Sequence, residues 1–264
     1  MEIIILTLAD LFSYGGDLAP QNPISPFRYM EILINRAATA KFGARDVLEI
    51  GPGSDTMIAH LDTSVLNSIT IVDYVEDALE RARRQLAALP VRTICCDITQ
   101  DGCPALLPES FDCVIANALV EHLKDDQGFM QKTRELLKPG GLMLCTTVLG
   151  PGMYNQWDHA VGHYRRYSLA SLRRLFQDFS QVQIIQSSLI QELVRPFFFH
   201  RLGNLKHGSL EENNLAFSGE HQEIGRPPYA GVYWALRFFL PVYLVVDWAL
   251  KGLQGGIAVV VARR

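Results

Sequence analysis

The sequence lacks concentrated charge of either sign. Its 264 residues carry 24 Lys and Arg against 28 Asp and Glu, which gives a formal net charge of −4. Proteins that bind nucleic acid do so largely through a basic surface, so this balance argues against a nucleic-acid partner. Repeats and low-complexity tracts are also missing, and 48% of the residues are hydrophobic. The chain is therefore predicted to form a single elaborated domain over residues 1–264.

Cysteine is scarce and has no spacing typical of a metal or redox motif. The five cysteines never form a C-x-x-C pattern, and their number is odd. This pattern favours free thiols in a reducing compartment over a disulfide framework. We therefore predict a cytoplasmic protein without structural zinc.

The chain shows neither a secretory leader nor an uninterrupted apolar span. The N-terminal segment MEIIILTLADLF has no basic region and no small-residue cleavage site. Residues 229–250 are apolar, but Arg237, Pro241 and Asp247 interrupt them and argue against a membrane span. We expect this segment to be a lid over a hydrophobic acceptor, a contact in a homodimer, or a helix that makes peripheral contact with a membrane.

Short apolar runs alternate with helical patterns from residue 46 onward. Continuous apolar strands between helices are typical of a parallel sheet covered on both faces, so the predicted fold is α/β and doubly wound. The expected strands are 46–50, 68–73, 91–96, 111–116, 142–148, 182–190 and 256–264. The expected helices are 27–43, a helix ending near 62, 75–89, a helix ending at 138, and 167–179 opened by Ser168.

The same alternation divides the domain into segments. Residues 1–45 are expected to form an N-terminal helical lid, 46–149 the core that binds a cofactor, and 150–190 an acceptor loop with a helix and the sixth strand. The 65 residues before the last strand are too many for a plain hairpin loop. A helical apolar insertion is therefore predicted over 191–255, followed by the last strand at 256–264.

A glycine turn follows the first predicted strand. Glu49 ends the strand, and Gly51 and Gly53 permit positive φ and a close approach of a ligand to the backbone. Asp73 closes the second strand and Asp97 the third, so both carboxylates are expected at one edge of the sheet. They suit the ribose hydroxyls and the amino group of an adenosine, although each acid could instead cap a helix or turn.

With these motifs the sequence resembles the class I S-adenosylmethionine-dependent methyltransferases. The matching segments are VLEIGPGSD (47–55), TIVDYVEDAL (70–79), CCDIT (95–99), ESFDCVIANALVEHL (109–123) and ELLKPGGLMLCTT (135–147). The resemblance implies a Rossmann-like seven-stranded sheet of order 3-2-1-4-5-7-6 with strand 7 antiparallel. Asp55 departs from the family, which often has a third glycine there. A nicotinamide dinucleotide is the rival cofactor, but its fingerprint needs glycine where Thr56 stands.

The resemblance also implies a set of cofactor-binding residues, with S-adenosylmethionine as methyl donor and S-adenosylhomocysteine as product. The set comprises Glu49, Gly51 and Gly53 for the methionine moiety, Asp73 for the ribose, Tyr74, Asp97 and Ile98 for the adenine, Asn117 for the sulfonium side, and His122 as a further member.

The candidate catalytic residues lie in a loop after the fifth strand. His159, His163 and Tyr164 are expected to face the acceptor, and Asp158 is available to orient an imidazole. A histidine here can take the proton of a hydroxyl acceptor, or it can brace the loop. No metal is predicted, because the sequence offers His159 and His163 no third ligand.

We predict that the protein transfers a methyl group from S-adenosylmethionine to an oxygen or nitrogen of a small organic metabolite. This reaction is a direct displacement, so alignment of the reacting atoms and exclusion of water are its main requirements. Arg165 and Arg166 are compatible with an acidic acceptor. Two alternatives stay open: methylation of a lipid-linked glycan at a membrane surface, and a cofactor-binding partner subunit without activity.

Overall fold

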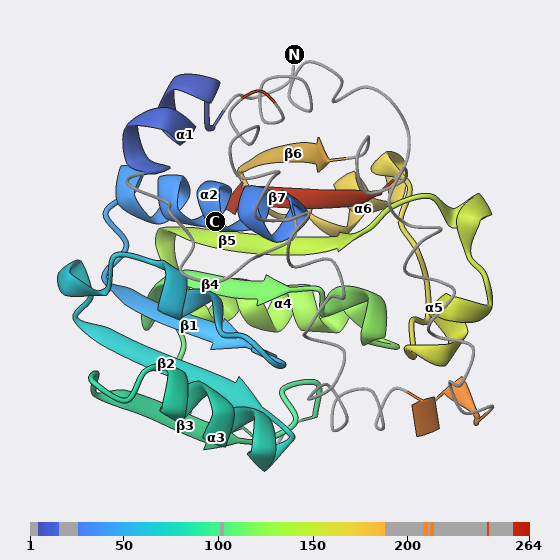
Figure 1. Ribbon diagram of the computed structural model, residues 1–264, viewed down its shortest axis with the longest axis horizontal. Coiled ribbons are helices and arrows are strands. Elements are labelled where there is room, and N and C mark those ends of the chain that lie inside the picture. The colour runs from blue at the N-terminus through green and yellow to red at the C-terminus, as the bar shows by residue number, and fades with distance from the viewer. Residues whose placement is uncertain are drawn as a thin grey trace.

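A seven-stranded sheet forms the centre of the computed structural model, which describes residues 5–15, 26–100, 103–187, 208–210, 212–213, 242 and 256–264 (Figure 1). The strand order β3-β2-β1-β4-β5-β7-β6 confirms the predicted topology. β7 pairs antiparallel with β5 and β6, and the other neighbours pair parallel. The strands are β1 (Asp46–Ile50), β2 (Ser68–Asp73), β3 (Val91–Cys95), β4 (Phe111–Asn117), β5 (Leu137–Val148), β6 (Gln181–Ser187) and β7 (Ile257–Arg263).

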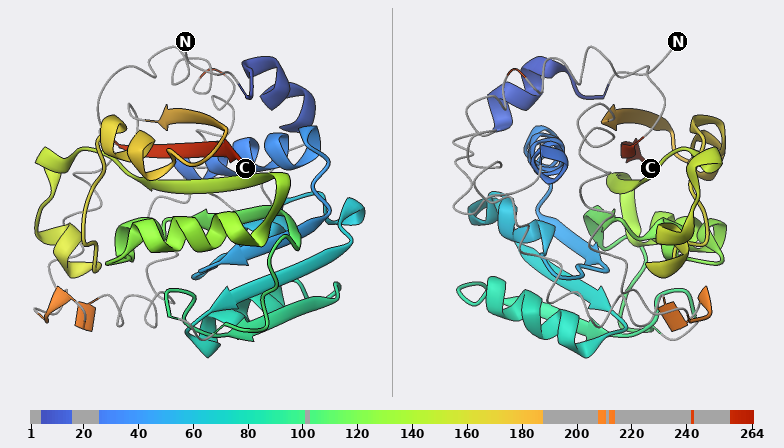
Figure 2. Two further views of the ribbon diagram at one scale, coloured as in Figure 1. Left: turned by 180° about the vertical axis from the view of Figure 1, so that it is seen from behind. Right: turned by 45° about the vertical axis from the view of Figure 1, so that its right-hand side comes forward.

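Helices cover both faces of the sheet (Figure 2). α2 and α3 pack on one face, and α4 and α6 pack on the other. Along β1, Val47 is buried on the face that α2 and α3 cover, and Leu48 is buried on the face that α4 and α6 cover, as expected for a strand buried on both sides. The α-helices are α1 (Leu8–Gly15), α2 (Pro26–Lys41), α3 (Glu76–Gln85), α4 (Asp126–Leu136), α5 (Gln156–Ala160) and α6 (Leu169–Leu175). The 3-10 turns are η1 (Met57–His60), η2 (Thr63–Val65), η3 (Val120–His122) and η4 (Pro151–Met153).

The N-terminal segment expected as a lid contributes α2 to the core. Ile32, Ile34 and Ala38 of this helix are buried with the sheet residues of one face. The first turn of α2 lies near the loop after β1, where Arg28 bonds to Asp55. α2 therefore links the body of the fold to the carboxyl edge of the sheet.

The chain after the glycine turn differs from the prediction. The structure has η1 and η2 where an α-helix ending near residue 62 was expected. The extended backbone of Leu61 ends η1, and the Asp62 side chain accepts the Ser64 N–H at 3.1 Å to open η2. Local side-chain capping by Asp62 therefore divides this segment into two short turns.

β5 begins earlier than predicted. Leu137 already pairs with Phe111, and the ladder resumes at Leu142 opposite Cys113, so the intervening residues bulge out of the strand. The expected helix ending at residue 138 stops at Leu136. Pro139 has no N–H to donate, which favours an early end of the helix and an irregular start of the strand.

The expectation of free thiols throughout is wrong. Cys96 and Cys103 form a disulfide, with Cα atoms 5.9 Å apart, while Cys113 and Cys145 are free and buried. The turn after β3 brings these two residues together, and neither an odd count nor the absence of C-x-x-C could exclude a pair seven residues apart. The cysteine argument for a reducing compartment therefore falls away, and the cytoplasmic localisation stays a prediction.

The last part of the domain is described only in part. α6 is shorter than the expected helix over 167–179, but it has the predicted N-cap, since Ser168 accepts the Ser171 N–H at 3.0 Å. The predicted insertion over 191–255, with the lid, homodimer or membrane segment 229–250, falls almost entirely outside the described residues. Within the described ranges, no helix combines the length and apolar character needed to cross a membrane.

Candidate active site

The turn after β1 depends on two glycines with left-handed backbone. Gly51 has a φ of +68° and Gly53 a φ of +59°, which L side chains rarely adopt. A Cβ at Gly51 would lie 3.1 Å from Leu119 Cδ1, whereas a Cβ at Gly53 would meet no atom of the described residues within 4 Å. The space beside Gly53 is therefore open to a ligand that approaches the backbone.

Alanine substitutions at the two glycines distinguish the cost of a left-handed backbone from the cost of crowding a neighbouring side chain. Gly53→Ala is expected to lower the free energy of unfolding by the left-handed backbone cost of about 1–2 kcal/mol. Gly51→Ala carries the same cost and also crowds Leu119, so we expect the larger loss there. Urea denaturation of both variants measures the difference. A smaller loss for Gly51→Ala than for Gly53→Ala would contradict this account.

Glu49 holds the segment that follows the turn. Its carboxylate accepts the Met57 N–H at 2.7 Å, the Ile58 N–H at 3.3 Å and the Thr56 hydroxyl. Burial raises the pKa of Glu49, although the hydrogen bonds from Thr56 and Met57 oppose the shift. In the structure this side chain shapes the loop, and its contact with a methionine moiety stays a prediction.

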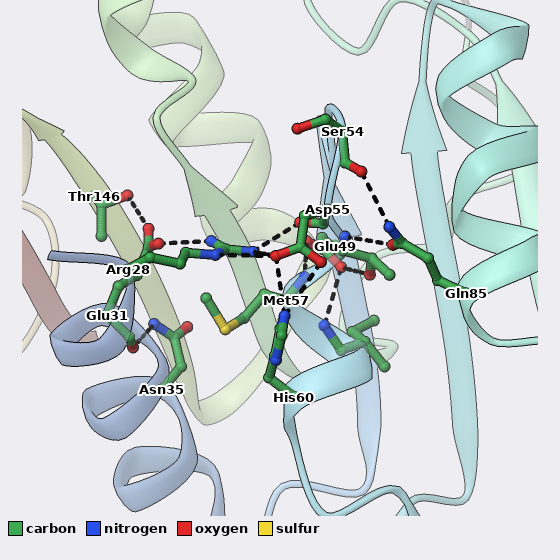
Figure 3. Close-up of polar contacts among 12 residues, drawn as sticks. Arg28, Glu31, Asn35, Glu49, Ser54, Asp55, Met57, His60, Gln85 and Thr146 are labelled. Atoms are coloured by element: carbon green, nitrogen blue, oxygen red, sulfur yellow. Dashed lines mark hydrogen bonds and ion pairs between the residues drawn. The ribbon is translucent and has the colours of Figure 1, made fainter. Parts of the chain in front are cut away.

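Arg28 is a site residue that sequence reasoning missed (Figure 3). Its guanidinium contacts the Asp55 carboxylate at 2.9 Å and the Glu31 carboxylate at 2.6 Å. His60 bonds to Asp55 from the other side at 3.0 Å, and Thr146 donates to Glu31 at 2.6 Å. The departure from the family at Asp55 therefore has a structural role, because the contact of this acid with Arg28 joins the turn after β1 to α2. No local motif marks Arg28, which lies far from the loop in sequence.

The second acid is placed as predicted. Asp73 ends β2, is buried, and accepts the Val75 N–H at 2.9 Å. Burial raises its pKa, against the lowering effect of backbone hydrogen bonds from Val75 and Tyr74. Its neighbour Tyr74 is 41% exposed, so the ring is accessible to a ligand at this edge.

The third acid serves a turn in the structure. Asp97 accepts the Thr99 N–H at 2.9 Å, the Thr99 hydroxyl at 2.6 Å and the Gln100 amide at 2.9 Å. Ile98 beside it is buried. The capping role foreseen for Asp97 is thus present, and the adenine contacts of Asp97 and Ile98 stay predictions.

Asn117 is the clearest unsatisfied group at this edge. It ends β4, and both polar atoms of its amide are buried without a hydrogen-bond partner among the described residues. A buried polar group left unpaired costs about 1–3 kcal/mol. Asn117 therefore points to a ligand atom that completes its bonding.

Asp158 organises the loop after β5. It is fully buried, and its Oδ1 contacts His163 Nδ1 at 2.9 Å and Arg166 Nε at 2.7 Å. The same carboxylate accepts the Asn155 N–H at 2.9 Å and so caps α5. The predicted orienting role of Asp158 is seen for His163, and Arg166 is engaged inside the protein and does not face an acidic acceptor.

His163 lies in a cluster that sequence reasoning did not assemble. The rings of His163 and His122 meet edge to face with centroids 4.6 Å apart, and Glu121 is buried beside them. One ligand atom from each of these three residues lies within 4.8 Å of the others. Glu121 and His122, from the loop after β4, thus lie beside His163 where sequence reasoning did not place them, and the absence of a metal stays a prediction.

The other two predicted catalytic residues lie outside this cluster. His159 is exposed, and its carbonyl accepts the Asn213 amide at 3.1 Å. Tyr164 is half-buried, with Lys124 Nζ 5.8 Å from its ring centroid. Arg165 is likewise engaged internally, at 2.8 Å from Asp126. The structure thus brings His163 together with His122, and separates His163 from His159.

The sheet order, the glycine turn, the acid after β2 and the amide after β4 together define a Rossmann-like methyltransferase. Over residues 26–180 the chain matches the family described as methyltransferase domain. The protein belongs to this family.

Relatives cover part of the chain. An uncharacterized methyltransferase of Mycobacterium tuberculosis is 30% identical over 123 residues, 46% of this chain and 60% of the relative. A ubiquinone biosynthesis O-methyltransferase of a Chelativorans species is 29% identical over 145 residues, 51% of this chain and 55% of the relative. The structure of Haemonchus contortus phosphoethanolamine N-methyltransferase 2 in complex with S-adenosyl-L-methionine shares the fold, with a TM-score of 0.54 and 19% identity over 96% of this chain and 56% of that one. The chain thus spans little more than half the length of these two curated relatives.

Proposed function

We propose that the protein transfers a methyl group from S-adenosylmethionine to an oxygen of a small organic acceptor. The observation that carries this proposal is the set at the carboxyl edge of the sheet: open space at Gly53, the carboxylate of Asp73 and the unpaired amide of Asn117. These groups fit a nucleoside with a polar amino-acid tail, and membership of the methyltransferase family supports this cofactor.

Each residue has a distinct task in binding. Asp73 accepts hydrogen bonds from the ribose hydroxyls, and Asn117 completes its bonding near the sulfur. Gly53 lets the methionine portion approach the backbone, while Gly51 provides the left-handed turn beside Leu119. Bound S-adenosylmethionine supplies an electrophilic methyl group. The protein adds alignment and exclusion of water, which together account for about 7–11 kcal/mol in favourable cases.

Oxygen is preferred over nitrogen as the accepting atom for two reasons. One relative is named as an O-methyltransferase. A hydroxyl must also lose its proton during transfer, and the cluster of Glu121, His122 and His163 offers groups that assist this loss. The acceptor hydroxyl is therefore proposed to bind beside this cluster.

Isothermal titration of the full chain with S-adenosylhomocysteine tests the proposal. We expect one molecule to bind per chain, and an acceptor hydroxyl compound to raise the melting temperature further in its presence. Absence of binding to folded protein would overturn the proposal. An acceptor response confined to amines would retain the methyltransferase and exclude oxygen as the target.

A further inference from the structure

We propose that Glu121, His122 and His163 bind a divalent first-row transition-metal ion, which holds the acceptor oxygen during methyl transfer. The role of the ion in transfer rests on the proposed function, whereas the binding of the ion does not. The three residues come from two loops, with Glu121 and His122 in η3 and His163 after α5. The Tyr164 N–H donates to the Glu121 carbonyl at 2.8 Å and fixes the two loops together.

The geometry of the cluster suits a chelate. The ligand atoms lie within 4.8 Å of one another, close enough for one ion to be held by all three residues. Asp158 occupies His163 Nδ1 at 2.9 Å, which leaves Nε2 as the ligand atom. A carboxylate behind a ligating histidine is the usual second partner in metal sites, because it fixes the ring and raises its basicity.

The surroundings of Glu121 also favour a cation. Its side chain is buried, and the Thr147 hydroxyl donates to Oε2 at 2.9 Å. A buried carboxylate is costly without a compensating charge, and a bound cation supplies one.

The ligand set selects the class of ion. Two imidazoles with one carboxylate suit zinc, iron, manganese or cobalt, whereas calcium and magnesium prefer oxygen ligands. Three protein ligands leave positions open for the acceptor. A bound ion lowers the pKa of the acceptor hydroxyl, which therefore releases its proton to solvent at a lower pH than in the free acceptor. The oxygen then forms the new bond to the methyl carbon, while the carbon–sulfur bond breaks and its electron pair stays on sulfur.

Isothermal titration of the untagged, metal-stripped full chain with ZnCl₂ tests ion binding. We expect one tight site per chain. His122→Ala and Glu121→Gln should each weaken it at least tenfold, and His122 is the less buried of the two side chains. His159→Ala is the matched control, because it removes an exposed histidine of the same region that lies outside the cluster. Its zinc affinity should stay within twofold of the original.

Two results would overturn the proposal: no zinc site in the original chain, or equal loss of zinc affinity in His122→Ala and His159→Ala. Titration of each protein with S-adenosylhomocysteine separates this failure from failure of the proposed function. Binding of S-adenosylhomocysteine without zinc refutes the ion site and leaves the methyltransferase intact. Binding of zinc without S-adenosylhomocysteine refutes the methyltransferase and supports the ion site.

Discussion

Asp73→Ala is expected to weaken S-adenosylhomocysteine binding by one to two orders of magnitude. Each hydrogen bond to a charged group contributes about 1.5–3 kcal/mol, and Asp73 is placed to accept such bonds from a ribose. Isothermal titration measures the loss directly. Affinity for the acceptor should change much less, because Asp73 is proposed to contact the ribose of the cofactor and not the acceptor.

Asp62→Ala is the matched control for this prediction. Asp62 and Asp73 each accept a backbone N–H two residues ahead, at 3.1 Å and 2.9 Å. Both alanine variants therefore lose the same kind of local cap, but only Asp73 lies at the carboxyl edge of the sheet. Equal cofactor affinities in the two variants would show that Asp73 acts only as a cap.

Asp158→Ala is expected to lower the free energy of unfolding by about 3–5 kcal/mol, the usual cost of removing one partner from a buried ion pair. The side chain of Arg166 is 4% exposed, so its charge would be left buried without its partner. His163 would lose its orienting bond as well. Urea denaturation near neutral pH measures the loss.

An exposed ion pair on α3 provides the control for the Asp158→Ala variant. Glu80 and Arg84 lie 3.5 Å apart on α3, and both side chains are more than half exposed. Glu80→Ala should cost less than about 1 kcal/mol, as is usual for such pairs. A loss for Asp158→Ala as small as that for Glu80→Ala would contradict the buried network.

The Asp158 carboxylate makes the free energy of unfolding depend on pH in a definite direction. Burial alone would raise the pKa of Asp158, but the hydrogen bonds from His163 and Arg166 outweigh burial and hold the pKa below its ordinary value. A lowered folded-state pKa means that the stabilisation is complete above the unfolded value of about 3.9. It is lost as the pH falls through the folded-state pKa. Asp158→Asn should therefore lose less stability than the original chain between pH 5 and acid pH.

Much of the sheet is predictable because its signals are local. Buried parallel strands appear as continuous apolar runs, and the acids that end them follow at once in sequence. These local signals suffice to place Glu49, Asp73 and Asn117 at one edge of the sheet. The early start of β5 is not predictable in this way, because the pairing of Leu137 with Phe111 depends on a neighbouring strand.

The loop after β5 shows an arrangement that the sequence alone could not predict. Sequence reasoning expected His159 and His163, four residues apart in the loop after the fifth strand, to face the acceptor together. α5 ends at Ala160, and Gly162 has a φ of +81°, so the chain reverses between the two histidines. His163 turns inward to His122, and His159 remains exposed. Such reversals, like the contact of Arg28 with Asp55, arise from tertiary packing.

The place of β7 between β5 and β6 has a consequence for synthesis on the ribosome. Roughly 70 residues separate the end of β6 from the start of β7. At about 5–20 residues per second, translation of this stretch takes about 4–14 s. Throughout that time β5 and β6 each present an unpaired edge, which is a template for wrong pairing with another nascent chain. Slow decoding of this stretch would therefore lengthen the time for which both strand edges are exposed.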